Sequence, residues 1–445
     1  MKKVITYGSF DLFHEGHYNL LKRAKELGDY LIVGVTTENY DRERGKLNVV
    51  DSLLTRMENV KKTGFADEII IEESSGQKYN DIKKYDVDIF TVGSDWVGSF
   101  DYLKDLCEVV YLERTKDISS TMLREQNEHI QRLGIIGSGR IANRFVRETK
   151  SVSGINAQGV YNPHFESAER FATEHEIAAY KDIEEFFDDV DSVYIASPHQ
   201  THYEYIKNSL KHGKHVLCEK PMVLKENEAR ELYAIAKEKG LILFEAIKTA
   251  YCPGFDKILG VAGSGIIGSI RNIEACFTKL EGKNTRELTD TRYGGSFTEL
   301  GSYVLLPAIK LLGADYDRLR FDSINDDNGL DLFTRVTMNY PHALVSATCG
   351  LGVKSEGRLL ISGTQGYIVA EAPWWKTAYF EVHFEDASRV EKFSERYLGE
   401  GFRYEISDFL YAIHGNEKHT FKMTREESIA MAGIMERFLT YNSRG

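Results

Sequence analysis

The chain has 445 residues and a formal net charge of −12, so it is too long for one ordinary hydrophobic core and too acidic for non-specific binding to nucleic acid or an anionic membrane surface. Its five cysteines are scattered without a CxxC pair, which argues against a disulfide framework or a zinc site and favours a reducing compartment. No apolar run approaches the roughly 20 residues that cross a bilayer, and Met1-Lys2-Lys3 leads directly into a β-type run, so we expect a cytoplasmic protein without membrane insertion.

The first predicted elements are a strand at residues 4–6, a glycine turn and a helix over residues 18–27, whose apolar residues have helical spacing. His14 and His17 fall near the start of this helix, with Gly16 between them. A helix N-terminus offers unpaired N–H groups and a positive dipole end, and a glycine lets the backbone approach a bound phosphate. One such histidine alone is more often a polar helix cap, but the pair with Gly16 predicts a nucleotide-phosphate site.

Strand-like and helical segments then alternate through the first third of the chain. The pattern predicts strands at residues 30–35, 68–71, 87–92 and 109–112, and helices at 52–63, 79–85 and 121–129. This rhythm is typical of a parallel Rossmann-like sheet, whose ligands gather at the carboxyl ends of the strands. Lys46, Arg56 and Arg114 fall at such ends and could neutralise a triphosphate, although a lone basic residue is usually a solvated surface charge.

Two separated motifs carry a family resemblance. Gly8-Ser9-Phe10-Asp11 with His14-Glu15-Gly16-His17 resembles the HxGH signature of the nucleotidyltransferase superfamily, and the segment Arg114-Thr115-Lys116-Asp117-Ile118-Ser119-Ser120-Thr121 resembles the second signature of its cytidylyltransferase branch. Gly93-Ser94-Asp95-Trp96 and Phe100-Asp101-Tyr102-Leu103 are similar to glycerol-3-phosphate cytidylyltransferases in particular. The resemblance spans residues 1 to about 124.

This resemblance implies a role for each matching residue. His14 and His17 would bind the β and γ phosphates of CTP, while Lys46 and Arg114 would brace the α phosphate and the departing pyrophosphate. Arg44 and Lys78 would meet the acceptor's phosphate, although an apparent one-residue insertion within residues 42–51 leaves the acceptor's identity open. The remaining expected CTP-binding residues are Gly8, Ser9, Phe10, Gly16, Arg56, Thr115, Ser119, Ser120 and Thr121.

The expected transfer reaction needs positioning and charge stabilisation more than covalent help from the protein. We predict direct in-line attack by an acceptor phosphate oxygen on the α phosphorus. Mg²⁺ is expected with CTP and would be held mostly by phosphate oxygens, so we predict no metal site built from protein ligands.

A second strand-turn-helix begins near residue 133, with no Gly or Pro break after the preceding predicted helix. Gly137-x-Gly139-x-x-Ala142 follows a β run and opens a helix that ends near Thr149, which is the context that a dinucleotide fingerprint requires. At the end of the next predicted strand, where an acidic residue would bind the ribose of NAD, the chain has Asn162, with His164 close by. NADP is therefore favoured mildly over NAD, and His164 could equally be an exposed loop residue.

Further motifs carry a second resemblance. A predicted strand at 193–196 ends in a turn from Ser197 to His202, a helix covers 203–212, and a strand at 215–218 ends in Glu219-Lys220-Pro221. With the Gly137 turn these motifs follow the order of the Gfo/Idh/MocA oxidoreductases, and the resemblance covers residue 132 to the C-terminus. In that family the lysine matching Lys220 orients the substrate oxygen. The implied cofactor-binding residues are Gly137, Ser138, Gly139, Arg140, Ile141, Asn162, Ser197, Pro198, His202, Glu219 and Lys220.

The last third predicts a final Rossmann strand at 241–246 and then a largely antiparallel sheet with one solvated or interface face. Its expected strands are residues 270–278, 333–339, 344–349, 359–362 and 379–384. The stretch from Gly294 to Tyr303 introduces a helix that runs to about residue 312 and resembles the family's catalytic helix. The resemblance implies Tyr303 as proton donor and Glu299 as a residue that places the substrate or base. We expect the Lys220 cation to stabilise the Tyr303 phenolate and so make the phenol a useful acid.

Arg286 and Arg292 precede that helix and could hold a substrate phosphate, although solvated loop charges are slightly the better interpretation. The predicted oxidoreductase substrate site consists of Lys220, Arg292, Glu299 and Tyr303.

These observations predict an α/β chain of three domains: a cytidylyltransferase at 1–130, an NAD(P)-binding Rossmann domain at 131–250, and a substrate and dimerisation domain at 251–445. The expected enzyme reduces a phosphorylated ketose or aldose to a polyol phosphate and couples it to CTP, giving a CDP-alditol, with CDP-glycerol favoured, for teichoic-acid-like or capsular polymers. The alternative is a cytidylyltransferase whose residues 132–445 form a non-catalytic nicotinamide-binding or dimerisation module. We expect a homodimer or higher homo-oligomer.

Overall fold

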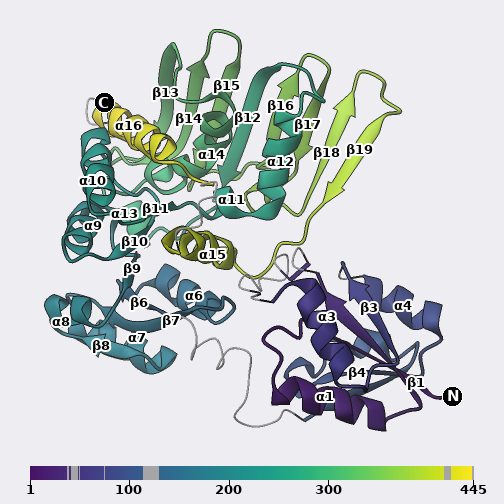
Figure 1. The fold of residues 1–445 in the computed structure, drawn as a ribbon. Helices are drawn as coiled ribbons and strands as arrows, with labels where there is room; N and C mark the ends of the chain where they lie inside the picture. Colours follow the sequence, from purple (N-terminus) through teal and green to yellow (C-terminus); the bar gives the residue numbers. More distant parts are fainter. Residues whose placement is uncertain are drawn as a thin grey trace. The chain divides into compact units, whose positions relative to one another are not determined.

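The computed structural model describes residues 1–37, 40, 41, 49, 51–74, 76–113, 130–414 and 422–442 (Figure 1). The chain divides into two compact units, the first comprising Met1–Ile130 and Ser151–Gly154 and the second Gln131–Lys150 and Ile155–Gly445. A further division near residue 250 stays a prediction. Within the described ranges, no helix has both the length and the apolar character needed to span a bilayer.

The first unit is built on a parallel sheet of five strands in the order β3-β2-β1-β4-β5. Its strands are β1 (Lys3–Gly8), β2 (Tyr30–Thr36), β3 (Glu68–Glu72), β4 (Ile89–Gly93) and β5 (Glu108–Leu112). Its described helices are α1 (Glu15–Glu26), α3 (Leu53–Lys62) and α4 (Gln77–Tyr85), with short 3-10 turns η1 (Ser94–Trp96) and η2 (Asp101–Leu103). The expected parallel Rossmann-like sheet is confirmed, and the first helix begins three residues earlier than its apolar spacing indicated.

Both faces of this sheet are buried. Val4 and Val33 belong to a core on one face, while Ile5 and Phe90 belong to a core on the other. Successive side chains of a strand point to opposite faces, so strands with apolar residues at consecutive positions need helices on both sides. The strand order reverses between β1 and β4, and ligands of such sheets bind at the carboxyl ends next to this reversal.

The second unit contains a parallel sheet of six strands in the order β11-β10-β9-β6-β7-β8. The strands are β6 (Gln131–Ile136), β7 (Ile155–Tyr161), β8 (Ala178–Tyr180), β9 (Ser192–Ile195), β10 (His215–Glu219) and β11 (Leu243–Ala246). The helices of this part are α6 (Arg140–Thr149), α7 (Phe165–His175), α8 (Ile183–Asp188), α9 (His202–Lys211) and α10 (Glu226–Glu238), with η3 (His199–Thr201). Here too the strand order reverses, between β6 and β9.

The same unit contains an eight-stranded sheet in the order β13-β14-β15-β12-β16-β17-β18-β19. Its strands are β12 (Ile270–Thr278), β13 (Arg318–Asn325), β14 (Asp331–Asn339), β15 (Leu344–Gly350), β16 (Leu359–Gly363), β17 (Gly366–Ala370), β18 (Tyr379–Phe384) and β19 (Val390–Ser394). All neighbours are antiparallel except β12 and β15, so the largely antiparallel sheet is confirmed. The strands β13, β17 and β19 were not anticipated.

Helices connect the two sheets of the second unit and cover them (Figure 1). These are α11 (Lys248–Tyr251), α12 (Pro253–Gly263), α13 (Arg286–Thr289), α14 (Ser296–Leu312), α15 (Phe402–Ile413) and α16 (Arg425–Asn442), with η4 (Trp374–Lys376). Helix α14 packs on β12, β14 and β15, and α16 packs against α10 and α14. Helix α15 returns to contact α6 and α11, and its Phe402 ring meets the Phe145 ring edge-on at 5.7 Å. The C-terminal segment therefore completes one wall of the dinucleotide fold.

Candidate active sites

The histidine pair of the first unit lies at the start of α1, directly after the loop that leaves β1. His14 is the N-cap, and its Nδ1 accepts a hydrogen bond of 3.0 Å from the Gly16 backbone N–H. An accepting Nδ1 places the proton of the neutral imidazole on Nε2, which makes Nε2 a donor. The His14 and His17 rings stack with centroids 3.9 Å apart. The cap therefore holds two imidazoles in parallel at the carboxyl end of β1.

The loop between β1 and α1 is tightly curled. Phe10 and Leu12 have positive φ angles of 51° and 46°, and the Phe10 side chain is fully buried. A Cβ added at Gly8 would lie 3.0 Å from the Phe10 ring. Asp11 accepts the Asp51 N–H at 2.9 Å, which ties this loop to the residue that precedes α3. Phe10, one of the predicted CTP-binding residues, therefore packs inside this loop. The centroid of its ring lies 5.4 Å from that of the His17 ring.

Arg56 lies beneath this loop rather than on an open surface. Its side chain is fully buried, and Nη1 donates to the carbonyl oxygens of Ser9 at 2.9 Å and Thr36 at 2.8 Å. The same nitrogen lies 3.3 Å from Asp41 Oδ2. Because the guanidinium joins the ends of β1 and β2, the structure favours a role in fixing the phosphate loop, and direct contact of Arg56 with CTP stays a prediction.

Lys78 is also buried, near the start of α4. Its ammonium forms an ion pair with Glu72, the last residue of β3, and lies 4.6 Å from the centre of the Tyr7 ring and 5.6 Å from that of Phe100. An ammonium at the carboxyl edge of the sheet suits an anionic acceptor, but its present partner is Glu72. Contact of Lys78 with the acceptor phosphate stays a prediction.

Seven predicted residues of this site lie outside the described residues. They are Arg44, Lys46, Arg114, Thr115, Ser119, Ser120 and Thr121. The described part of the chain contains no group of three or more His, Cys, Asp or Glu side chains able to hold a metal ion.

The dinucleotide turn of the second unit follows β6 and opens α6, as its sequence predicts. Gly137 has a φ of 100°, and a Cβ added there would lie 2.7 Å from the Ala196 carbonyl oxygen, so the close passage of two strands requires a glycine. A Cβ at Gly139, in contrast, would meet nothing within 4 Å. The N-terminus of α6 has no side-chain cap, and its first residues line a cavity, so pyrophosphate binding at these N–H groups stays a prediction.

Asn162 follows β7 and turns toward this cradle. Its Nδ2 donates to Ser138 Oγ at 2.8 Å, and its Oδ1 accepts the His164 backbone N–H at 2.9 Å. Arg170 and Ser167 of α7 line the same cavity and hydrogen bond to each other at 3.1 Å. The position where an acidic residue would contact a ribose is thus surrounded by donors.

His202 is fully buried at the start of α9, with Nε2 2.9 Å from the Ser197 carbonyl oxygen and Nδ1 3.0 Å from the Pro221 carbonyl oxygen. Burial lowers its pKa to about 4. The neutral imidazole has one N–H, so it can donate to only one of these two carbonyl oxygens at a time. It is not among the described residues that line the cavity, so a direct cofactor contact stays a prediction.

The predicted reaction residues meet in one place. Lys220 follows β10, and its ammonium donates to the Glu299 carbonyl oxygen at 3.0 Å and lies 3.8 Å from Glu299 Oε2. Glu299 and Tyr303 are one turn apart on α14, so they share a helix face. The ammonium lies 5.7 Å from the centre of the Tyr303 ring. All three side chains line a cavity of about 1070 Å³ that also contains Gly137, Ser138, Gly139 and Pro198.

The electrostatics of Tyr303 differ from the expectation. Burial, followed by Glu219 and Glu405, raises the pKa of its phenol well above the ordinary value. The surroundings thus favour the neutral phenol over its anion, contrary to the stabilisation of the phenolate expected from Lys220. Tyr303 therefore stays protonated through neutral pH and can give up its proton only to an oxygen that becomes strongly basic, such as one that gains negative charge during reduction.

Two further residues line the cavity: His199, which was not predicted, and Arg286, for which a solvated loop charge was the preferred interpretation. His199 is buried, its Nε2 lies 3.7 Å from Glu299 Oε1, and burial followed by the Lys220 charge lowers its pKa well below the ordinary value. Arg286 donates to Glu299 Oε1 at 3.0 Å. In the sequence, the position of His199 within the Pro198 to His202 turn was the feature that could have indicated its place in this site. Arg292 does not line the cavity in the described chain, and its guanidinium lies 5.1 Å from the centre of the Tyr293 ring, so its substrate role stays a prediction.

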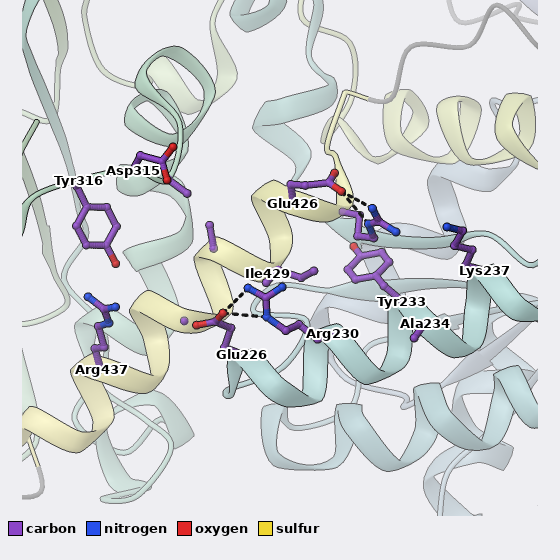
Figure 2. Close-up of a pocket in the computed structure, with 14 residues that line it drawn as sticks. Glu226, Arg230, Tyr233, Ala234, Lys237, Asp315, Tyr316, Glu426, Ile429 and Arg437 are labelled. Atoms are coloured by element: carbon purple, nitrogen blue, oxygen red, sulfur yellow. Dashed lines mark hydrogen bonds and ion pairs between the residues drawn. The ribbon is translucent and has the colours of Figure 1, made fainter.

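A second cavity of about 700 Å³ lies between α10 and α16 (Figure 2). Two ion pairs belong to its lining: Arg230 lies 2.6 Å from Glu226, and Arg425 lies 2.6 Å from Glu426. Tyr233 contributes an aromatic surface between them. None of the predicted site residues lines this cavity.

Comparison with known proteins gives separate matches for the two parts. The family model described as "Cytidylyltransferase-like" matches residues 5–126. A glycerol-3-phosphate cytidylyltransferase of Bacillus spizizenii is 49% identical over 125 residues, which cover 28% of this chain and 96% of that protein. Its counterpart from Staphylococcus aureus is 46% identical over 126 residues, covering 28% of this chain and 95% of that protein.

The family model described as "Oxidoreductase family, NAD-binding Rossmann fold" matches residues 131–247. A trans-1,2-dihydrobenzene-1,2-diol dehydrogenase of Bos taurus is 30% identical over 261 residues, covering 57% of this chain and 78% of that protein. A crystal structure of a 3-ketoreductase from Actinomadura kijaniata with NADP and TDP-benzene has a TM-score of 0.60 at 23% identity, and covers 69% of this chain and 96% of that one. At this level of sequence identity, the structural similarity is evidence for a shared fold alone.

The folds and sites define an α/β enzyme with a nucleotidyltransferase unit and a dinucleotide-binding oxidoreductase unit. Both resemblances expected from the sequence are confirmed. The chain belongs to the cytidylyltransferase-like family through its N-terminal part and to the Gfo/Idh/MocA oxidoreductase family through the rest.

Proposed function

We propose that the chain catalyses two consecutive reactions: reduction of a phosphorylated ketose or aldose to a polyol phosphate, and transfer of CMP from CTP to that phosphate. The products are a CDP-alditol and pyrophosphate. CDP-glycerol is the favoured product because the N-terminal part is 49% identical to a glycerol-3-phosphate cytidylyltransferase. Dihydroxyacetone phosphate is then the natural substrate of the reductase. A CDP-alditol of this kind suits the synthesis of teichoic-acid-like or capsular polymers.

The observation that carries the proposal is that Lys220, Glu299 and Tyr303 meet in a cavity whose lining also includes the Gly137 to Gly139 turn. A module that only bound a dinucleotide would need the turn but not a lysine, a carboxylate and a phenol beside it. This arrangement favours the bifunctional enzyme over the non-catalytic alternative.

Bound NADPH would supply the hydride that adds to the carbonyl carbon. Tyr303 would give its phenolic proton to the carbonyl oxygen as negative charge develops there, and Lys220 would hold that oxygen in place. Glu299, which contacts Lys220 and Arg286, would fix both cations. NADP rather than NAD is favoured by Asn162 and by Arg170, because a nearby arginine can bind a 2′-phosphate.

In the first unit, an acceptor phosphate oxygen would attack the α phosphorus of CTP while the bond to the β-phosphate oxygen breaks and pyrophosphate leaves. His14 and His17 would donate to the β and γ phosphates, and Lys46 and Arg114 would neutralise the α phosphate and the leaving group. Mg²⁺ bound to CTP would stabilise the departing charge.

The test supplies CTP, NADPH and a panel of sugar and triose phosphates, and follows CDP-product formation and NADPH consumption in parallel. The proposal expects equal amounts of NADPH consumed and CDP-alditol formed from the correct carbonyl phosphate. Product that forms only from ready-made polyol phosphate, with no NADPH consumed for any carbonyl, would reject the reductase reaction and leave the transferase alone.

A further inference from the structure

Most cations that line the oxidoreductase cavity have an acidic partner. Arg140 lies 2.9 Å from Glu287, and Lys376 lies 3.2 Å from Glu400. Arg144, Arg170 and Lys248 have no ion pair among the described residues, and for the Lys248 ammonium no hydrogen bond is found there either. The ammonium instead lies 4.3 Å from the centre of the Phe402 ring. Lys248 is therefore a cavity cation that the protein itself does not neutralise by direct contact.

The fold places Lys248 close to the reaction residues. It is the first residue of α11 and follows β11, which pairs in parallel with β10 so that Glu219 lies opposite Ala246. Lys220 and Lys248 thus leave the carboxyl ends of two adjacent strands. Both line the same cavity as Tyr303.

The acids that interact electrostatically with Lys248 do not pair with it directly. Glu405 is fully buried, neither of its carboxyl oxygens has a hydrogen-bond partner among the described residues, and burial raises its pKa well above the ordinary value. Burial also raises the pKa of Glu219. Burial lowers the pKa of the Lys248 ammonium, and the charges of Glu219 and Glu405 act against that shift, so the ammonium keeps part of its desolvation cost. An anion that enters the cavity would offset this cost.

The walls around this cation are aromatic. The Phe277 and Trp375 rings stack with centroids 3.6 Å apart, and the Phe277 ring lies 5.3 Å from that of Tyr303. Flat apolar walls offer few hydrogen bonds, so recognition here depends on charge and size. Lys376 lines the same cavity, and its positive charge repels that of Lys248 and lowers the pKa of Lys248. A single compact anion would relieve this repulsion.

We propose that Lys248 binds the phosphate group of the carbonyl substrate, so that the oxidoreductase site selects small carbonyl compounds that carry a phosphate monoester. This inference rests on the reductase activity proposed above and assigns the residue that recognises the phosphorylated substrate. Lys248 acts in specificity, whereas Tyr303 and Lys220 act on the reacting oxygen.

The test compares wild type with Lys248→Met, which keeps an apolar stem on the Phe402 ring, and with Lys248→Arg, which keeps the charge. Lys257→Met is the matched control, because that ammonium also lies over a phenylalanine ring, at 5.8 Å from Phe393, but does not line the cavity. Binding is read from the fluorescence of NADPH bound to the full chain during titration with 2-phosphoglycolate or with glycolate. This signal reports the oxidoreductase site and does not require turnover.

We expect wild type and Lys257→Met to bind 2-phosphoglycolate much more tightly than glycolate. Lys248→Met should bind 2-phosphoglycolate at least about 10-fold more weakly, with unchanged NADPH affinity and melting temperature, and Lys248→Arg should recover part of the loss. In turnover, Lys248→Met should raise KM for dihydroxyacetone phosphate at least about 10-fold, with little change in kcat and no change for dihydroxyacetone.

Equal binding of 2-phosphoglycolate by wild type and Lys248→Met, or equal binding of glycolate and 2-phosphoglycolate by wild type, would overturn the assignment. A Lys248-dependent preference for 2-phosphoglycolate without NADPH oxidation by any carbonyl phosphate would support the anion site and reject the reductase proposal. Reduction of dihydroxyacetone phosphate that does not depend on Lys248 would support the reductase proposal and reject the assignment of Lys248.

Discussion

The two units place a nucleotide site at the same topological position but build it differently. In each, the first strand of a parallel sheet runs into a helix beside the point where the strand order reverses. Helix α1 is capped by His14, and two stacked imidazoles stand at its start. Helix α6 begins at Gly139 without a side-chain cap and faces open space.

This difference matches the chemistry expected at each site. Phosphoryl transfer needs directed donors on the phosphates that change charge, and side chains supply such donors. A dinucleotide's pyrophosphate takes no part in hydride transfer, so backbone N–H groups and the helix dipole are sufficient to hold it. The side chains that act in the second unit lie elsewhere in the cavity, at the ends of β10 and on α14.

The largest expected effect is loss of cytidylyl transfer when the imidazoles are removed. The double variant His14→Ala with His17→Ala should reduce pyrophosphate release from CTP by about 10³-fold or more, because it removes donors to the leaving group. NADPH oxidation by the same protein should not change. His14→Asn is the control for folding, because asparagine also caps helices. Pyrophosphate release by the double variant within twofold of wild type would contradict the assignment.

Removal of the phenol should affect only the second unit. Tyr303→Phe should lower kcat for carbonyl reduction by about 10²-fold or more, because it removes the proton donor. Since the pKa of Tyr303 is raised, the wild-type reaction should show no loss from ionisation of this phenol near neutral pH. The measurement is kcat for NADPH oxidation from pH 6 to 9, with NADPH affinity and CMP transfer as internal controls. Unchanged kcat in Tyr303→Phe would assign proton donation to another group.

The two glycines of the dinucleotide turn should respond differently to an added methyl group. Gly139→Ala should weaken NADP binding by about 10-fold without lowering the melting temperature, because the methyl group enters the open cradle. Gly137→Ala should lower the melting temperature, because its Cβ would lie 2.7 Å from the Ala196 oxygen. Calorimetric binding and thermal unfolding distinguish these outcomes. Normal NADP affinity in Gly139→Ala would place the pyrophosphate elsewhere.

The smallest predicted effect concerns pH and stability. Burial raises the pKa of Glu245 to about 7 from 4.5, so its protonated form stabilises the second unit. This contribution is complete below pH 4.5 and is lost as pH rises through about 7, by on the order of 3 kcal/mol. In the first unit, the hydrogen bond from Lys104 lowers the pKa of Asp101, so stability linked to Asp101 is instead lost at acidic pH.

Glu245→Gln should therefore make thermal unfolding of the second unit less dependent on pH between 5 and 8. Glu238→Gln, at an exposed position of α10, is the control and should follow wild type. If the melting temperatures of Glu245→Gln and wild type differ by the same amount at pH 5 and pH 8, the raised pKa is refuted.

The local motifs were predictable from the sequence, and they fixed the fold class. Gly137, Gly139 and the His14 to His17 segment specify particular backbone turns between a strand and a helix, and such turns depend on neighbouring residues. The helix that carries Glu299 and Tyr303 was likewise expected, and it runs from Ser296 to Leu312. The strands β17 and β19 were missed because these five-residue segments lack a clear apolar alternation. In β13, by contrast, Leu319 and Phe321 alternate with charged residues, so this strand was predictable.

The sequence by itself determined that two nucleotide-binding turns occur in one chain, because turn geometry and hydrophobic period are local properties. Only the tertiary structure decided what each charged side chain does. It buried Arg56 under the loop between β1 and α1, paired Glu299 with Lys220 and Arg286, and gave Lys248 no ionic partner within the described parts of the chain. Burial and the distance between charges set these outcomes, and both depend on residues far apart in the sequence.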